Sequence, residues 1–188
     1  KVTISTNASL LDEKKAKELI DSGLDDIMFS VDGYKKETFE AIRLGLNFDI
    51  VVKNILNFIK IRNGKEKPTI RIRMVLQEKN KNEVEDFKKF WKRKVGKQDT
   101  VYAKEMHSWG NQLDSYEGRK EIEKYSKIPC ISPWSSFVIH HDGKIPLCGA
   151  DYDNKIILGD LNKAGIKEIW NSRKLQEIRK MHSTGNRN

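Results

Sequence analysis

The 188-residue chain has two cysteines, Cys130 and Cys148, at the two ends of the stretch CISPWSSFVIHHDGKIPLC. Thiolates bind zinc and iron–sulfur clusters, but a complete site of either kind needs four ligands. Neighbouring side chains of a strand point to opposite faces, so at most one of His140 and His141 can join the cysteines. A metal site at this pair therefore needs further ligands from elsewhere.

Two other interpretations of the cysteine pair stay open at this point. A disulfide closing this loop would contribute about 3 kcal/mol by the loop-entropy estimate, but it persists only in an oxidising compartment. Two free cysteines buried in the core of a cytosolic protein are the common alternative. The spacing alone does not decide between a disulfide, two buried thiols and half of a metal site.

The segment before Cys148 is typical of a β-hairpin. Two apolar runs flank Asp142–Gly143, a dipeptide that favours a type I′ turn. In that register His141 pairs with Lys144 and Phe137 with Cys148. Because Pro146 has no N–H, we expect its strand at the edge of a sheet. Cys148 then lies at the base of the hairpin, where Cys130 can approach it.

Upstream, segments with strand and helix patterns alternate four times. The β-branched and alternating stretches predict strands at 1–6, 24–33, 69–77 and 99–109. Apolar residues at helical spacing predict helices at 11–23, 35–45, 48–64 and 83–96. This order predicts parallel strands joined by right-handed crossovers. The apolar run Ile27–Phe29 is typical of a parallel strand covered by helices on both faces.

Single residues sharpen the helix predictions. Asp12 is a candidate N-cap, and Gly23 and Gly64 are candidate helix stops. The apolar stripes expected to face the core are Ile50, Val51, Ile55, Phe58 and Ile59 in the third helix, and Val84, Phe87, Phe90 and Trp91 in the fourth.

Ligands of parallel α/β sheets bind at the carboxyl ends of the strands. Those ends carry Thr6–Asn7, Ser30–Asp32, Val75–Gln77 and Met106–His107. The site of any chemistry is therefore expected among these four groups of residues.

Charge and composition exclude some classes of partner. The net charge is +9, but the lysines alternate with acids as on solvated helix faces, so the sequence does not indicate nucleic-acid binding. WKRKVGK, at 91–97, is the exception, and it lies at a helix end where cations are favoured. No segment has the length and apolarity of a membrane span or a signal peptide. We therefore expect a soluble cytoplasmic protein with no membrane partner.

These motifs together resemble a known family. Cys130, twelve residues, Gly143, four residues and Cys148 resemble the opening of the SPASM domain. The hairpin, the GDL turn and IKEIWNSRKLQEIRKMHSTGN resemble the rest of its first half. VTISTNAS, DDIMFSVDG, TIRIRMVLQ and VYAKEMHSW are similar to the third to sixth strands of a radical SAM core.

The resemblance implies an α/β fold in which 1–109 form the C-terminal part of a partial (βα)6 barrel. A linker or insertion at 110–129 and the N-terminal part of a SPASM domain at 130–188, a small α+β domain with a β-hairpin, would follow. The implied cofactors are S-adenosylmethionine (SAM) and [4Fe–4S] clusters.

The resemblance also implies roles for single residues. Ser30 and Arg43 match the positions that contact SAM, and Asp32 matches a contact to its ribose. In the absence of the family, Asp32 would be interpreted as a helix cap and Arg43 as the surface partner of Glu37 or Glu40.

Further positions follow the same resemblance. Met74 and Val75 on the fifth strand would lie beside the adenine. Asn7 matches a position at the third strand, although Ala8 follows it where the family usually has Gly. Cys130 and Cys148 match the first two ligands of an auxiliary cluster. No catalytic acid is assigned.

The chain also departs from the family. It has no C-x-x-x-C-x-x-C triplet for the catalytic cluster, no Gly-Gly-Glu run for the methionine amine and no later C-x-x-C group. We therefore expect an internal fragment, inactive alone, of an enzyme that cleaves SAM and abstracts hydrogen from a peptide or protein. Flavodoxin or ferredoxin would supply electrons. The alternative is a non-catalytic α/β module that binds a metal or a peptide.

Overall fold

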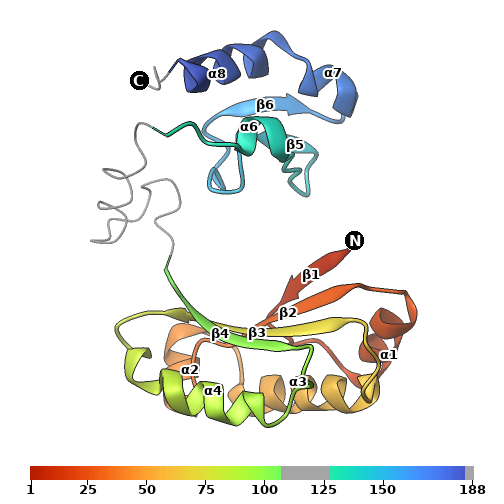
Figure 1. The fold of residues 1–188 in the computed structure, drawn as a ribbon, viewed down its shortest axis with the longest axis vertical. Helices are drawn as coiled ribbons and strands as arrows, with labels where there is room; N and C mark the ends of the chain where they lie inside the picture. The colour runs from red at the N-terminus through yellow and green to blue at the C-terminus, as the bar shows by residue number, and fades with distance from the viewer. Residues whose placement is uncertain (107–127, 185–188) are drawn as a thin grey trace. The chain divides into compact units, whose positions relative to one another are not determined.

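The computed structural model describes residues 1–106 and 128–184. The chain divides into two compact units, Lys1–Met106 and His107–Asn188 (Figure 1). They are called the sheet unit and the C-terminal unit below. None of the described helices is long and apolar enough to cross a membrane.

The sheet unit contains the four predicted strands, all parallel and in chain order. They are β1 (Thr3–Thr6), β2 (Asp26–Ser30), β3 (Thr69–Leu76) and β4 (Thr100–Glu105). The predicted alternation of strands and helices is confirmed. His107 to Trp109, the end of the fourth predicted strand, lie outside the described residues.

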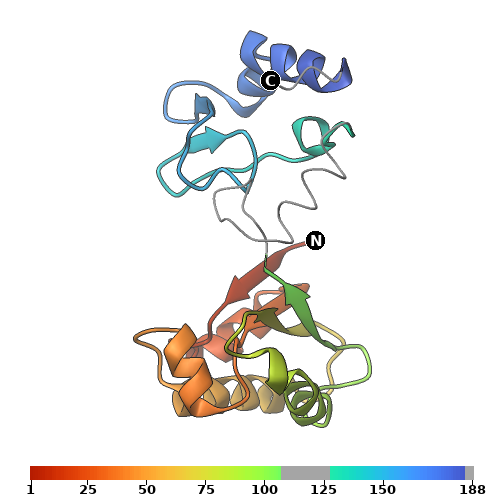
Figure 2. The ribbon, with the colours of Figure 1, turned by 90° about the vertical axis from the view of Figure 1, so that its left-hand side faces the viewer.

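The four helices of this unit lie on one face of the sheet (Figures 1 and 2). They are α1 (Glu13–Asp21), α2 (Lys36–Ile42), α3 (Phe48–Arg62) and α4 (Val84–Lys92), with the 3-10 turn η1 (Lys81–Glu83) before α4. Burying each large apolar side chain between the two layers contributes about 1.5–3 kcal/mol. This core contains Ile27, Phe29, Ile70, Ile72 and Met74 from the strands and Val51, Ile55, Phe58, Phe87 and Trp91 from the helices.

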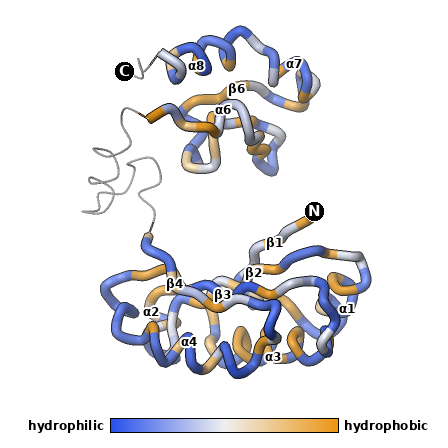
Figure 3. Tube along the Cα trace, in the orientation of Figure 1, coloured by the Kyte–Doolittle hydropathy of each residue, from blue (hydrophilic) through white to orange (hydrophobic). Residues whose placement is uncertain are grey.

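The prediction that helices cover β2 on both faces is wrong. Met28, between the core residues Ile27 and Phe29, points to the opposite face of the sheet and is half-buried. On that face β3 presents polar residues that alternate with its apolar core residues (Figure 3). Thr69, Arg71 and Arg73 are therefore directed away from the helices.

The observed helix ends and apolar stripes agree with those predicted from the sequence, with one exception. Asp12 caps α1 by accepting a hydrogen bond from the Lys15 N–H at 2.8 Å, and Gly23 beyond its end has a φ of 78°. Ile50 is 50% exposed, so its assignment to the core stripe of α3 is wrong. The buried stripe of α3 is Val51, Ile55, Phe58 and Arg62, which has regular helical spacing.

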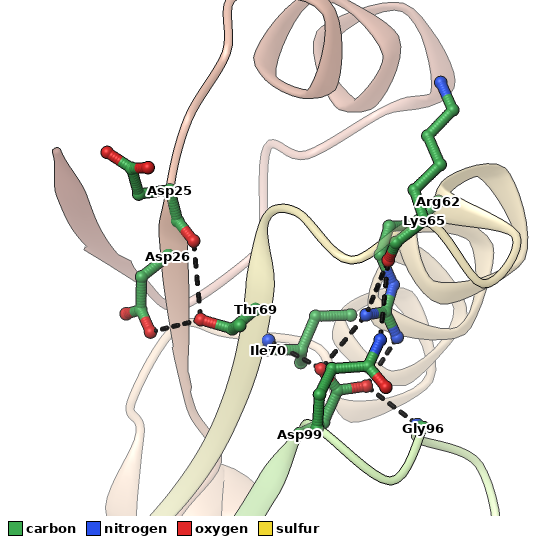
Figure 4. A network of polar contacts seen from close by, with 9 residues as sticks. Asp25, Asp26, Arg62, Lys65, Thr69, Ile70, Gly96 and Asp99 are labelled. Carbon is green, nitrogen blue, oxygen red and sulfur yellow. Dashed lines mark hydrogen bonds and ion pairs between the residues drawn. The ribbon is translucent and has the colours of Figure 1, made fainter. Parts of the chain in front are cut away.

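Arg62 is the polar member of that stripe and forms a buried ion pair with Asp99 (Figure 4). Their side chains are 2% and 0% exposed, and the Arg62 Nη2 to Asp99 Oδ2 distance is 2.5 Å. Asp99 also accepts from the backbone N–H groups of Ile70 (2.9 Å) and Gly96 (2.7 Å). Because every charged oxygen has donors, the pair ties α3 to the beginnings of β3 and β4.

The C-terminal unit is a small domain around a second core. Its elements are α6 (Ser132–Ser135), β5 (Lys144–Pro146), β6 (Ile157–Asp160), α7 (Ile166–Trp170) and α8 (Arg173–Ser183). Its buried apolar residues are Ile145, Leu158, Ile169 and Leu175. The Arg179 guanidinium stacks 4.5 Å from the Trp170 ring centroid and donates to the Pro133 carbonyl at 2.9 Å. This side chain thereby joins α8 to α7 and α6.

A β-hairpin is present in this unit, but its register differs from the prediction. β5 pairs in antiparallel fashion with β6, not with the run before Asp142. At the turn, the backbone N–H of His140, not that of His141, donates to the Lys144 carbonyl (2.9 Å), and the Gly143 N–H donates to the His140 carbonyl. Gly143 has a positive φ of 83° and Asp142 does not. The turn is therefore one residue longer than a type I′ turn, which shifts the register.

Candidate functional site at the carboxyl ends of the strands

Asp32 connects three parts of the sheet unit just beyond the end of β2. Its carboxylate is almost fully buried: Oδ1 accepts the Val75 N–H at 2.7 Å, and Oδ2 accepts Arg43 Nε at 2.7 Å and Nη2 at 2.5 Å. Val75 belongs to β3, and Arg43 is the C-cap of α2. This buried carboxylate thus joins the ends of β2 and β3 and orients the Arg43 guanidinium.

This geometry corrects the roles that Asp32 and Arg43 were expected to have if the family resemblance is set aside. Arg43 pairs with Asp32 and not with Glu37 or Glu40. Asp32 is not a helix cap either, because the N-cap of α2 is Lys35, which makes no side-chain capping bond. The Arg43 side chain is 34% exposed, so part of its guanidinium faces solvent and can meet an anionic ligand.

Two residues missed by the sequence analysis hold the same edge. Asn80 is fully buried; its Nδ2 donates to the carbonyls of Asp32 (3.0 Å) and Val75 (2.9 Å), and its Oδ1 accepts the Gln77 N–H (2.8 Å). It joins the ends of β2 and β3 in place of further ladder bonds. The sequence feature that could have identified Asn80 is its polar side chain between the end of a strand and the following helix.

Glu83 is the second missed residue. Its carboxylate accepts the backbone N–H groups of Tyr34 (2.7 Å) and Lys35 (3.1 Å) and the Thr38 hydroxyl (2.5 Å). Burial acts to raise the pKa of Glu83, but these hydrogen bonds outweigh it and hold the pKa below its ordinary value. An ionised Glu83 therefore fixes the loop between β2 and α2, which carries Asp32.

Asn7 lies in a tight turn after β1. Its Oδ1 accepts from the backbone N–H (3.0 Å) and hydroxyl (2.8 Å) of Ser9, while Asn54 Nδ2 donates to the Ala8 carbonyl (2.9 Å). Ala8 has a positive φ of 61°, a conformation that glycine adopts more easily than alanine. The backbone thus has the geometry of a glycine position, although this chain places Ala8 there.

Ser30, Val75 and Met74 occupy different sides of the sheet. The Ser30 hydroxyl is nearly buried and accepts from Arg73 Nη2 at 3.2 Å. Val75 is half-buried on the face without helices, whereas Met74 is fully buried in the core against the helices. The Met74 side chain is therefore turned away from a ligand on the open face, because neighbouring residues of a strand point to opposite sides.

The structure thus brings most of the predicted residues to one edge. Thr6 pairs with Phe29, so Asn7 follows beside Ser30 along this edge. Asp32, Arg43 and Val75 are joined by hydrogen bonds. Met74 lies at the same end of β3 as Val75, but its side chain is on the face that the helices cover.

The two cysteines lie in the C-terminal unit and are free thiols. Cys130 is exposed and Cys148 is half-buried, so neither the disulfide nor the pair of fully buried thiols predicted as alternatives is present. The Cys130 N–H donates to His182 Nδ1 at 3.3 Å, and the Cys148 carbonyl accepts from the Asp151 N–H at 3.1 Å.

An iron–sulfur cluster requires four ligands, of which two cysteines can supply at most two. Within residues 1–106 and 128–184, no group of three His, Cys, Asp or Glu residues is arranged to hold a metal ion. The described residues therefore do not form a complete cluster site.

Comparison with known proteins adds two findings. Residues 130–188 match the family model of SPASM, an iron–sulfur cluster-binding domain. The chain is similar in structure to hexahistidine-tagged anSMEcpe with bound AdoMet, with a TM-score of 0.62 and 19% identity over 96% of this chain. Native anSMEcpe with bound AdoMet and Kp18Cys peptide gives a TM-score of 0.61 and 18% identity over 99% of this chain. At these identities the likeness concerns the fold.

The chain spans only part of these relatives. It covers 56% and 60% of the two anSMEcpe chains. An uncharacterized protein of Treponema pallidum (strain Nichols) is 27% identical over 106 residues, which are 55% of this chain and 28% of that protein. The chain thus has an α/β part with a parallel four-stranded sheet and a C-terminal part that matches the SPASM domain, and its fold is similar to that of anSMEcpe over most of its length.

Proposed function

We propose that this chain is part of a radical SAM enzyme that cleaves SAM reductively and abstracts hydrogen from a peptide or protein. Residues 1–109 would be the C-terminal part of a partial (βα)6 barrel, 110–129 a linker, and 130–188 the beginning of the auxiliary-cluster domain. The observation that carries the proposal is the network of Asp32, Arg43 and Val75 at the carboxyl ends of the strands, in a chain whose C-terminal part matches SPASM.

Each residue of this edge has a proposed task. Arg43, aimed by the buried Asp32, would pair with the carboxylate of SAM through its exposed side. The Ser30 hydroxyl and the Asn7 side chain would hydrogen-bond the polar parts of the cofactor, and Val75 would give the adenine an apolar contact. Asp32 already accepts three hydrogen bonds, so we propose that it acts mainly through Arg43.

The cluster chemistry would depend on residues beyond this set. A [4Fe–4S] cluster supplies the electron that cleaves SAM, and the C-x-x-x-C-x-x-C ligands for it are not in this chain. Cys130 and Cys148 would provide the first two ligands of an auxiliary cluster. Flavodoxin or ferredoxin would be the electron donor of the whole enzyme.

SAM binding by the 188-residue chain tests the role of the sheet unit. We expect saturable binding in equilibrium dialysis and about tenfold weaker binding in Arg43→Met, because a charge-assisted hydrogen bond is lost. Arg173→Met is the matched control, since that arginine is 93% exposed in the C-terminal unit. Equal SAM binding by both variants and the unsubstituted chain would contradict the assignment of Arg43.

Activity is tested on the longer protein that contains this chain. After anaerobic reconstitution with iron and sulfide, we expect iron to be retained and 5′-deoxyadenosine to form from SAM. Zinc without iron, together with no 5′-deoxyadenosine, would instead support the non-catalytic metal- or peptide-binding module.

A further inference from the structure

The face of the sheet opposite the helices carries an excess of positive charge. Its charged strand residues are Asp26 on β2, Arg71 and Arg73 on β3 and Lys104 on β4, placed there by the strand registers. We call this surface the open face. Its described strands present three cations and one carboxylate.

Arg71 is the cation that the carboxylate neutralises. Asp26 Oδ1 accepts from Arg71 Nε at 2.8 Å and also from Nη2, and the Thr69 hydroxyl donates to Asp26 Oδ2 at 2.7 Å. Burial opposes ionisation of Asp26, but the hydrogen bonds from Arg71 and Thr69 hold its pKa below the ordinary value. This pair is therefore ionised and leaves no charge for a ligand.

Arg73 lacks such a partner. Its Nη2 donates to the neutral Ser30 hydroxyl at 3.2 Å, and its Nε is buried without a hydrogen-bond partner in the part of the chain that the structure describes. The residue is half-buried, and no carboxylate pairs with it in residues 1–106 or 128–184. A guanidinium without a carboxylate partner can bind an anion through two parallel, charge-assisted hydrogen bonds.

The neighbours of Arg73 on the open face are a tyrosine and a further cation. Tyr102 lies opposite Arg73 in the register, and its hydroxyl donates to Met28 Sδ at 3.4 Å, a contact that runs from β4 to β2 across β3. Lys104 lies opposite Val75, one step toward the carboxyl ends of the strands. Within residues 1–106 and 128–184 neither Arg73 nor Lys104 forms an ion pair, so these two cations extend toward the edge where Arg43 lies.

We propose that the open face binds a carboxylate of the substrate through Arg73, supported by Lys104, and that the substrate is an acidic peptide. This inference deepens the proposed function, because the substrate is taken to be a peptide lying beside the cofactor. A carboxylate on this face could also be that of SAM itself. Arg73 is a specificity-determining residue for the substrate only if the peptide supplies the carboxylate.

The test compares two blocked tripeptides that differ only in a central glutamate or glutamine, without SAM. The ¹⁵N-labelled 188-residue chain is titrated with each, and the Arg73 Nε–Hε signal, assigned by its loss in Arg73→Lys, is followed by NMR. We expect the glutamate peptide to shift this signal and to bind about tenfold more tightly than the glutamine peptide.

Two variants and one control complete the design. Arg73→Met should remove the preference for glutamate, and Lys104→Met should reduce it about twofold, since an exposed lysine contributes little. Arg173→Met should keep the preference. If Arg73→Met does not fold, by circular dichroism, then Arg73→Lys and the Nε shift of the unsubstituted chain decide the outcome.

Several results would overturn the inference. These are equal binding of the two peptides, no saturable binding of the glutamate peptide up to millimolar concentration, and equal loss of preference in Arg173→Met. A shift of the Arg73 signal by SAM, but not by 5′-methylthioadenosine or the glutamate peptide, would assign the carboxylate to SAM. That last result would refute the acidic peptide and leave the proposed SAM site intact, whereas failure of SAM to bind would bear on the proposed function alone.

Discussion

Asp32 should stabilise the sheet unit measurably, and Asp32→Asn isolates the contribution of its charge. The asparagine oxygen can still accept the Val75 N–H, which now donates to a neutral acceptor instead of a carboxylate. The amide nitrogen, however, would face Arg43 Nε and Nη2, so donors would meet donors.

The magnitude follows from these contacts. A hydrogen bond to a charged group contributes about 1.5–3 kcal/mol, but Arg43 is one-third exposed and water screens its part of the interaction. We therefore expect Asp32→Asn to lower the free energy of unfolding by about 2 kcal/mol. Asp32→Ala also leaves the buried Val75 N–H without an acceptor and should cost about 3–4 kcal/mol.

Urea denaturation and hydrogen exchange of the Val75 amide together measure this effect. Asp21→Asn is the matched control, since Asp21 is exposed at the end of α1, and it should stay within about 0.5 kcal/mol of the unsubstituted chain. We expect Val75 exchange to accelerate far more in Asp32→Ala than in the control.

The opposite pattern would refute this reasoning. If Asp32→Asn kept its free energy of unfolding within about 0.5 kcal/mol and lost only SAM binding, Asp32 would be a direct contact to the cofactor. In that case the ribose contact implied by the resemblance would be right, and the role of aiming Arg43 would be wrong.

Two further predictions concern ion pairs of the sheet unit. Arg62→Met should lower the free energy of unfolding by about 3–5 kcal/mol, because it leaves the buried Asp99 without its counter-charge; adding Asp99→Asn should recover part of this loss in urea denaturation, and an additive double variant would contradict the coupling. The hydrogen bonds from Lys67 and the Val2 N–H lower the pKa of Asp25 to about 2, so its stabilising effect is complete above the ordinary pKa near 3.8 and is lost as the pH falls toward 2. The melting temperature between these pH values should therefore depend less on pH in Lys67→Met, and an unchanged dependence would show that Asp25 does not contribute through Lys67.

The positions of the strands and helices could be predicted because local patterns specify them, and their alternation along the chain predicted parallel strands. Alternating residues in β3 and the caps of α1 are properties of a few neighbouring residues, and the structure confirms them. Asp12 and Gly23, for example, occupy the cap positions that their residue types favour. The two faces of β3 were likewise readable from Arg71, Ile72 and Arg73.

The partners of Asp32 could not be predicted in the same way. Its carboxylate meets Val75, which is 43 residues away in the sequence, and no local pattern indicates that contact. The contact of Asn80 with the Asp32 carbonyl and that of Glu83 with the Tyr34 N–H were missed for the same reason, because they span 48 and 49 residues of the sequence. Such contacts depend on how two strands end relative to each other, which is a property of the assembled sheet.

The hairpin shows how one residue of turn geometry changes a site prediction. The pairing of His141 with Lys144 assumed a two-residue turn, whereas the observed turn brings His140 opposite Lys144. A slip of one residue reverses which side chains share a face. The predicted pairing of His141 with Lys144 is therefore wrong by one residue.

The alternation in β3 finally bears on what the sheet is for. A parallel strand covered by helices on both faces is apolar throughout, because both faces are buried. β3 instead has Ile70, Ile72 and Met74 in the core and Arg71 and Arg73 on the open face. A sheet with helices on one side and charge on the other supports the proposed partial barrel, whose interior must stay accessible to ligands. Asp26 already neutralises Arg71, and within residues 1–106 and 128–184 no carboxylate pairs with Arg73, so an anionic ligand would give this guanidinium its counter-charge.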